Sequence, residues 1–328
     1  CRETRKPEPN MCAGKVTGEY FDVTFPTPMG EFSFPVRFFR PKHSVFGDRM
    51  PLVIHINFRP LIPDRLFPLE EITDQGYATI QVYYEDITSD NGDYTNGLAG
   101  HYPEYGTEEG NRTPTAWGKI RMWAYALSRL MDVLQRRDDI FTDKIFVAGH
   151  SRLGKTALVT AAFDDRFAGA CSNDSGCSGA AITRDKVGEL VTHITKNFPF
   201  WFCENYYKYV NNESSLPFDQ HWLIAANIPH KVYVASAEGD IWAGPKNEYL
   251  PHNYEKNSVA YIGTHDNDTA LGWLYTADPA DIQFMKVYFD FDEQGWDEGG
   301  KKKLVWQLIR KVMATVCNTA IVSMQDYL

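Results

Sequence analysis

The sequence has few of the features that would place it in several common classes of protein. Its six cysteines are scattered through 328 residues and include no C-x-x-C pair, which excludes a small disulfide-stapled scaffold and argues against a zinc site. No run approaches the roughly 20 apolar residues that a membrane-spanning helix needs. Acidic residues outnumber basic ones, and the net charge is −10. Neither a nucleic acid nor an anionic membrane is therefore expected as a partner.

A secretory signal peptide is also missing, and the first residue is Cys1 rather than methionine. Such a start is expected of a mature or trimmed chain. A cysteine at a mature N-terminus is also expected of a bacterial lipoprotein.

Apolar residues are abundant, and their spacing predicts strands first and then strands that alternate with helices. Hydrophobic residues make up 43% of the chain, enough for one large α/β domain or one domain with an appendage. Strands are predicted over residues 18–25, 32–39, 52–58, 78–84, 144–147, 167–172 and 231–236, and a helix over 116–137. This order predicts a doubly wound mixed sheet with antiparallel strands at one edge.

A serine lies between glycines where a predicted strand passes into a predicted helix. Residues 147–156 read V-A-G-H-S-R-L-G-K-T, and a serine on such a sharp turn is how an α/β-hydrolase presents its nucleophile. Backbone N–H groups at the helix N-terminus would stabilise a developing oxyanion. Gly154 comes one position later than in the common G-x-S-x-G. The stretch predicts Ser151 as the nucleophile of an α/β-hydrolase, a three-layer αβα sandwich.

A serine nucleophile needs a histidine as base and an acid that orients the histidine, and in this fold both follow the serine in the chain. His265 follows a predicted strand over residues 258–263, which is where this fold places its base. Asp174 follows the strand after the elbow, and Glu238 and Asp240 follow the next strand. These three carboxylates are all candidates for the acid.

The motif G-H-S-R-L-G-K at residues 149–155 resembles the nucleophile signature of the glucuronoyl esterases, whose bacterial members carry G-[CH]-S-R-x-G-K. The resemblance covers roughly residues 17–250. It includes N-F-R at 57–59, S-N-D-S-G-C at 172–177, F-P-F-W-F-C at 198–203, L-P-F-D-Q-H at 216–221 and V-A-S-A-E at 234–238.

This resemblance implies a serine esterase that cleaves the ester between glucuronic acid side groups of xylan and lignin alcohols through an acyl-enzyme. It implies that Arg152 stabilises the oxyanion with its own backbone N–H, that Lys155 donates to sugar hydroxyls and that Trp242 packs against the sugar ring. Glu189 is a further candidate for a sugar contact. The expected partner is plant cell-wall polysaccharide, with no metal or cofactor. We expect a monomeric bacterial protein that is secreted or lies at the cell surface or in the periplasm.

The choice of acid follows from one departure from the family pattern. Many bacterial members have W-A-D after the late strand, where the Asp is the triad acid, but residues 242–244 read W-A-G here. The other acid position of the family, 23 residues after the serine, is Asp174 in this chain. The resemblance therefore favours Asp174 over Glu238 and Asp240.

The esterase pattern fades after about residue 250, and a second resemblance begins. G-T-H-D-N-D-T-A-L-G-W at 263–273 resembles a motif of the amylomaltases, the 4-α-glucanotransferases, and the likeness extends to the last residue. Nothing matches the barrel that carries the other active-site carboxylates of that family. We expect an esterase body over residues 1–255 and an amylomaltase-like segment over 256–328, packed on the same domain as a natural fusion or a chimera. The apolar spacing over 304–313 predicts a final helix.

Three other functions stay open. A catalytically impaired carbohydrate-binding relic is motivated by the missing Asp at Gly244 and by the foreign tail. Another carbohydrate esterase, acetyl or feruloyl, is open because a fold does not fix the substrate. A glucanotransferase would need more than the tail. The tyrosine-rich segment over residues 86–117 is expected to be a loop that forms a platform for a polysaccharide or lignin ring, or that packs against itself.

Overall fold

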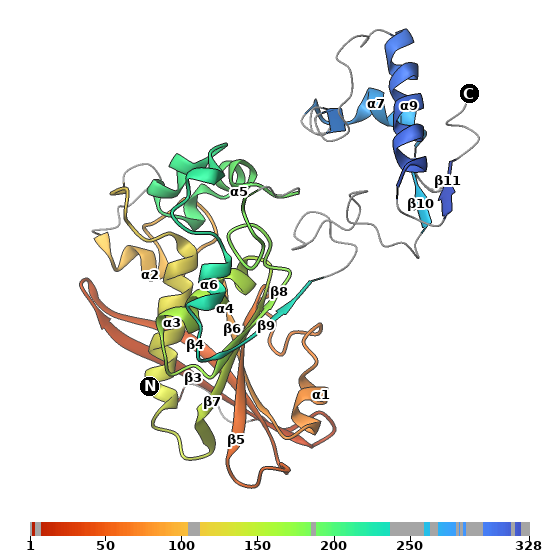
Figure 1. The fold of residues 1–328 in the computed structure, drawn as a ribbon. Helices are drawn as coiled ribbons and strands as arrows, with labels where there is room; N and C mark the ends of the chain where they lie inside the picture. The colour runs from red at the N-terminus through yellow and green to blue at the C-terminus, as the bar shows by residue number, and fades with distance from the viewer. Residues whose placement is uncertain are drawn as a thin grey trace. The chain divides into compact units, whose positions relative to one another are not determined.

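The chain folds as two compact units, Cys1–Lys246 and Asn247–Leu328, which Figure 1 colours by residue number. The computed structural model describes residues 2–3, 8–103, 112–184, 188–236, 259–262, 268–279, 282, 285–286, 298–315 and 319–322. The boundary predicted after residue 255 falls outside these described residues. Its place, and the packing of the tail on the body, stay predictions.

The first unit is built on one sheet of nine strands, counted over the described residues. The strands are β1 Arg2–Glu3, β2 Glu8–Met11, β3 Val16–Thr27, β4 Gly30–Pro41, β5 Met50–Asn57, β6 Ala78–Tyr83, β7 Ile140–His150, β8 Gly169–Asn173 and β9 Lys231–Ala235. They lie in the order β1-β3-β4-β6-β5-β7-β8-β9, with β2 beside β3. The pairs from β1 to β4 and the pair of β4 with β6 are antiparallel, whereas β6, β5, β7, β8 and β9 run parallel. The predicted mixed sheet is confirmed.

The chain changes direction across the sheet after β6. β6 lies on one side of β5, and β7 returns to the other side. The space between β5 and β7 is therefore a topological switch point, and open α/β sheets bind ligands outside the carboxyl ends of their strands at such a point. Because β7 ends at His150, the strand order puts Ser151 at this place.

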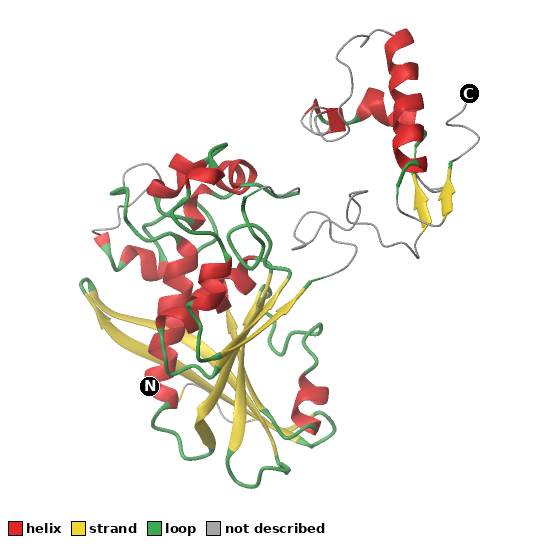
Figure 2. Ribbon diagram, in the orientation of Figure 1, coloured by secondary structure: helices red, strands yellow, loops and turns green. Residues whose placement is uncertain are grey.

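Helices cover both faces of the sheet (Figure 2), which confirms the predicted three-layer sandwich. The helices are α1 Leu69–Asp74, α2 Gly97–Gly100, α3 Lys119–Leu134, α4 Arg152–Phe163, α5 Val191–Asn197 and α6 His221–Ala225, with 3-10 helices η1 Tyr84–Asp86, η3 Pro199–Trp201, η4 Glu204–Tyr209 and η5 Glu213–Ser215. Successive side chains of a strand point to opposite faces. In β4, Phe38 therefore belongs to the large core with α3 and α4, whereas Phe39 packs with Leu69 of α1.

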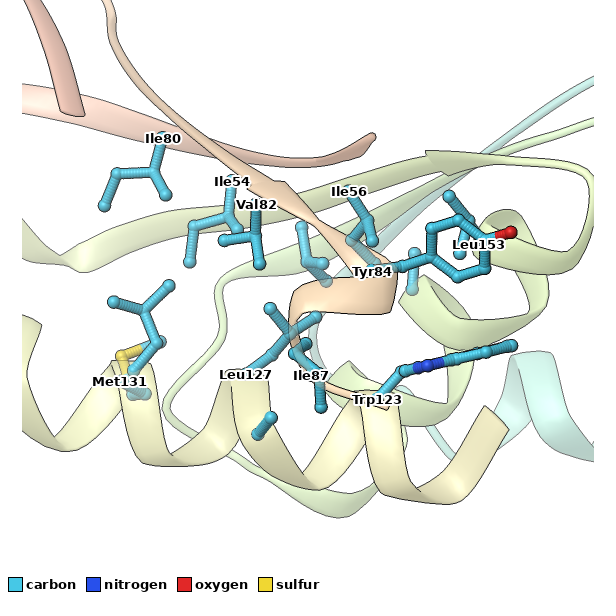
Figure 3. Packing of buried hydrophobic residues seen from close by; sticks show 14 of the residues in the cluster. Ile54, Ile56, Ile80, Val82, Tyr84, Ile87, Trp123, Leu127, Met131 and Leu153 are labelled. Carbon is cyan, nitrogen blue, oxygen red and sulfur yellow. The ribbon is translucent and has the colours of Figure 1, made fainter. Parts of the chain in front are cut away.

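The large core joins the central strands to α3 and α4 (Figure 3). Its members include Ile54, Ile56, Ile80, Val82, Tyr84, Ile87, Trp123, Leu127, Met131 and Leu153. The helix predicted over 116–137 is observed as α3. It begins after Gly118, whose backbone lies so close to Trp201 that a Cβ would be 2.1 Å from that residue's carbonyl oxygen.

The segment predicted as a loop over residues 86–117 is held against α3 in its described part. Lys119 of α3 is fully buried, and its ammonium donates to the carbonyl oxygen of Asp93 over 2.6 Å. Tyr94 is also fully buried, and its hydroxyl donates to the carbonyl oxygen of Phe200 over 2.7 Å. Tyr94 therefore packs inside the protein and is not part of a surface platform.

The second unit has a short parallel strand pair and helices in its described residues. These elements are β10 Val259–Tyr261, β11 Thr319–Ile321, α7 Ala270–Thr276 and α9 Glu298–Met313. The unit has its own buried cluster of Ala270, Leu274, Met285, Leu304, Val305 and Ile309. The final helix predicted from the apolar spacing is thus confirmed as α9. None of the helices described in either unit is long and apolar enough to cross a membrane.

Candidate active site

Ser151 lies on a strained turn between β7 and α4. Its backbone has φ 54° and ψ −124°, and α4 begins at the next residue. Residues other than glycine seldom adopt a positive φ, and such strain persists where the surrounding structure fixes it. The turn places the serine at the carboxyl edge of the sheet, as a nucleophile elbow does.

The backbone approaches both glycines of the motif closely, and at Gly149 the approach leaves no room for a Cβ. A Cβ on Gly149 would lie 2.2 Å from the carbonyl oxygen of Leu153, and a Cβ on Gly154 would lie 3.0 Å from that of Asn173. Leu153 occupies the usual position of the second glycine and is fully buried in the large core. The later glycine instead allows α4 to approach the end of β8, which explains the shifted spacing.

Two backbone hydrogen bonds hold Ser151 at the start of α4. Its carbonyl oxygen accepts from the N–H of Lys155 (3.1 Å), and its N–H donates to the carbonyl oxygen of Asn173 (2.8 Å). The first N–H groups of a helix have no partner within the helix and carry the positive end of its dipole. An oxyanion formed on an ester bound at Ser151 would meet these donors.

Arg152 follows the predicted nucleophile directly, and its guanidinium lies among three aromatic rings. Its Cζ lies 4.7 Å from the ring centroid of Trp201, 5.3 Å from that of Phe198 and 5.5 Å from that of Phe58. Nη1 donates to the carboxylate of Asp90, whereas Nε is buried and has no hydrogen-bond partner among the described residues. The cation is thus surrounded by aromatic rings and hydrogen-bonded to one carboxylate. Asp90 was not predicted, because nothing in its local sequence separates it from other loop aspartates.

Lys155 and Glu189, both predicted to contact a sugar, lie together. The Lys155 side chain is 3% exposed, and its ammonium is 3.9 Å from Glu189 Oε2. The ammonium also donates to the carbonyl oxygen of Ser175 and lies 5.9 Å from the ring centroid of Trp201. Lys155 therefore lies near the same tryptophan ring as Arg152, and it is buried although the sequence motif alone did not indicate this. Its contact with a sugar stays a prediction.

Asp174, the predicted acid, follows β8 directly. β8 is the parallel neighbour of β7, and Asn173 is opposite His150 in the register. The backbone of Asp174 has φ 42°, and its N–H donates to the carbonyl oxygen of Ala235 over 2.8 Å. The carboxyl ends of two adjacent strands thus bring Ser151 and Asp174 to the same edge of the sheet. The catalytic role of Asp174 stays a prediction.

The other predicted site residues, Glu238, Asp240, Trp242 and His265, lie outside the described residues. Within the described part, the histidine nearest in sequence is His150, whose Nδ1 lies 2.9 Å from Asn173 Nδ2. No hydrogen bond from Ser151 Oγ to a histidine is found within that part. In the same residues, no group of three or more His, Cys, Asp or Glu side chains is arranged to hold a metal ion.

Two protein families match different parts of the chain. The model of the fungal glucuronyl esterases matches residues 29–257, and that of the 4-alpha-glucanotransferases matches residues 230–328. Carbohydrate esterase MZ0003 from an unknown prokaryotic organism is 42% identical over 182 residues, which are 56% of this chain and 42% of the relative. The 4-alpha-glucanotransferase of Clostridium butyricum is 46% identical over 84 residues, 25% of this chain and 16% of the relative.

Solved structures of esterases also resemble the chain. A promiscuous CE15 esterase from a marine bacterial metagenome has a TM-score of 0.63 at 30% identity, covering 75% of this chain and 69% of its own. A CE15 glucuronoyl esterase from Teredinibacter turnerae has a TM-score of 0.65 at 27% identity, covering 76% and 64%.

The chain spans 42% of the length of MZ0003 and 41% of that of a 4-O-methyl-glucuronoyl methylesterase from Podospora anserina. Both resemblances inferred from the sequence motifs are confirmed, the second for the C-terminal region only. Because the esterase model spans residues 29–257, more than half of the chain, the chain belongs to the glucuronoyl esterase family.

Proposed function

We propose that this chain is a serine esterase that hydrolyses esters of (4-O-methyl-)glucuronic acid in the linkages between glucuronoxylan and lignin. The strained elbow at Ser151, with Arg152 as the next residue in the chain, carries the proposal. An elbow serves a nucleophile, and a cation next to it serves the negative charge that forms during acyl transfer. The family of the chain supplies the substrate class.

In the proposed reaction, Ser151 Oγ attacks the carboxyl carbon of the uronate while the base, His265, takes its proton. Asp174 orients the histidine. The C–O bond to the alcohol breaks as the histidine returns the proton to the leaving oxygen, and an acyl-enzyme remains. Water then hydrolyses the acyl-enzyme by the same steps in the second half-reaction.

The oxyanion of each tetrahedral intermediate is stabilised by the N-terminus of α4 and by Arg152. One such donor supplies about 2.7–4 kcal/mol of transition-state stabilisation in a serine hydrolase. Lys155, Glu189 and Trp242 are proposed to contact the sugar. The proposed partner is plant cell-wall polysaccharide, met by a monomer that is secreted or held at the bacterial cell surface or in the periplasm.

The C-terminal unit raises one question about the triad. We propose that His265, in the amylomaltase-like segment, supplies the base. Its position after a strand, in a His-Asp pair, supports this assignment. The segment by itself has no counterpart of the other carboxylates that transglycosylation needs.

The test is hydrolysis of benzyl glucuronate by the parent chain and by S151A and H265A. We expect turnover by the parent and a loss of about 10⁴-fold or more in each variant. Turnover that survives S151A would overturn the nucleophile assignment, and turnover that survives H265A would assign the base to another residue. A folded but inert parent that still binds glucuronoxylan would favour the binding relic. Faster cleavage of acetyl or feruloyl esters than of benzyl glucuronate would show that the chain is a carbohydrate esterase of another substrate class.

A further inference from the structure

Asp90 accepts hydrogen bonds from three side chains that belong to separate parts of the chain. Its Oδ2 accepts from Arg152 Nη1 and from the hydroxyl of Tyr84 (3.0 Å), and its Oδ1 accepts from Trp201 Nε1 (2.6 Å). The Asp90 side chain is only 6% exposed. Both of its oxygens are engaged, so this carboxylate has little freedom to turn.

The aromatic rings around Arg152 hold its charge but do not fix its direction. Trp201 and Phe198 are stacked, with centroids 3.9 Å apart and planes at 4°. The Arg152 Cζ is 4.7 Å and 5.3 Å from these two centroids, so it lies beside the stack. These ring contacts include no hydrogen-bond acceptor, so they do not set the direction of the guanidinium N–H groups. A hydrogen bond between a guanidinium and a carboxylate does fix the direction of the N–H groups.

We propose that Asp90 is the positioning residue of Arg152: it orients the guanidinium so that its remaining N–H groups meet the oxyanion formed when Ser151 attacks an ester. This inference rests on the proposed function, since it assigns to Asp90 a part in the same reaction. Asp90 acts only through Arg152 and does not itself touch the substrate.

A carboxylate near an oxyanion costs some of the stabilisation that the cation supplies. Coulomb energy falls as 1/r, and an oxyanion at about 3 Å from the guanidinium would be roughly twice as far from the Asp90 carboxylate. The pair therefore still attracts the oxyanion. The carboxylate reduces the attraction between Arg152 and the oxyanion but fixes the direction of the Arg152 N–H groups. This compensates for the loss, because preorganised donors need no reorientation at the transition state.

Tyr84 and Trp201 keep Asp90 in place. Burial and the negative charge of Asp90 raise the pKa of Tyr84, so its hydroxyl remains a donor through the neutral range. The indole N–H of Trp201 has no other protonation state. The carboxylate is therefore held by two donors besides Arg152, and the direction of its bond to Arg152 follows from the fold.

The test is a double-mutant cycle of D90A and R152A, measured as kcat and KM on benzyl glucuronate. Removing one oxyanion donor lowers kcat by about 10²–10³-fold, and D90A is expected to lose no more than R152A does. We expect D90A to lower kcat with little change in KM, and to lower it less than about threefold in the R152A background. D90N retains one acceptor oxygen and is expected to fall between D90A and the parent.

D93N is the matched control. Asp93 lies in the same loop, and its carboxylate accepts from Thr95 and Asn96, with no contact to Arg152. We expect D93N to keep the kcat of the parent. Equal losses in D90A and D93N, or a D90A loss that is fully retained in the R152A background, would overturn the proposal. Thermal unfolding of each variant identifies losses that come from misfolding.

A second measurement separates this proposal from the proposed function. The rate at which a fluorophosphonate modifies Ser151 depends on the nucleophile and the oxyanion donors but needs no glucuronate pocket. If the parent does not cleave benzyl glucuronate yet reacts with the probe, the substrate assignment fails, and the same cycle on the labelling rate decides the role of Asp90. If the parent does not react with the probe either, both proposals fail.

Discussion

The backbone N–H of Ser151 donates to the carbonyl oxygen of Asn173 over 2.8 Å. This bond ties the predicted nucleophile to the end of the neighbouring strand β8, one residue before Asp174. A charged side chain at that position lies on the same edge of the sheet as the serine. The role of Asp174 as the triad acid, which the family resemblance implies, stays a prediction.

Replacement of Asp174 by Asn is therefore expected to lower kcat on benzyl glucuronate by about 10⁴-fold, as loss of the triad acid does in a serine protease. The amide no longer stabilises the histidine in the protonation state that catalysis needs. The variants E238Q and D240N, measured beside it, test the two other candidates. If one of them is inactive while D174N is active, the triad acid is that residue.

Replacement of Gly149 by Ala is expected to destabilise the fold, because the new Cβ would lie 2.2 Å from the carbonyl oxygen of Leu153. A backbone oxygen in a helix start cannot easily move, so the loss should reach about 2–3 kcal/mol in the free energy of unfolding. Urea unfolding measures it. G154A is the comparison, since its Cβ would be 3.0 Å from the nearest atom, and it should cost less. Equal stability of G149A and the parent would contradict the close approach.

The strands and helices of the fold could be predicted from the sequence more completely than the contacts of the candidate active site. Periods of two and of 3.6 residues mark the strands and α3 because burial of one face requires them. The strands β1 and β2, of two and four residues, are too short to show a period and were not predicted. The elbow was predicted because its glycines, serine and helix start are consecutive in the chain.

The partners of the elbow could not be predicted in the same way. Asp90 and Arg152 are 62 residues apart, and two further aspartates lie near Asp90 in sequence, Asp86 at the end of η1 and Asp93 in the same loop. Only the fold of that loop, held by the buried Lys119, decides which carboxylate reaches the guanidinium. Lys155 was predicted from its motif, but its burial depends on how α4 packs against the turn after β8.

Lys119 is expected to make stability depend on pH. Burial lowers the pKa of Lys119 from 10.5 to about 8 in the folded protein. Between about pH 8 and 10.5 the unfolded chain therefore binds more of this proton than the folded one, so stability rises with pH by up to about 1.4 kcal/mol per unit. Below pH 8 Lys119 is charged in both the folded and the unfolded state, so the folded protein bears the full free-energy cost of burying the charged ammonium.

The variant K119M isolates this contribution. The difference in unfolding free energy between parent and K119M should change across pH 8 to 10, whereas the contributions of tyrosines and cysteines cancel in the difference. Urea unfolding at several pH values gives both curves. If the two curves of unfolding free energy against pH are parallel, burial does not lower the pKa of Lys119.

Lys155 is expected to act in sugar binding more than in catalysis. Its ammonium lies 3.9 Å from Glu189 Oε2, beside the ring of Trp201 that also faces Arg152. Loss of one hydrogen bond from a charged group to a sugar hydroxyl costs about 1.4 kcal/mol or more, a tenfold change in affinity. K155M should therefore raise KM for benzyl glucuronate about tenfold or more and leave hydrolysis of p-nitrophenyl acetate, which has no sugar, near the parent rate.

Because K155M alone leaves Glu189 buried without its cation, the double variant K155M/E189Q serves as the control for folding. Equal losses on both substrates in a folded variant would mean that Lys155 supports the nucleophile helix and not the sugar.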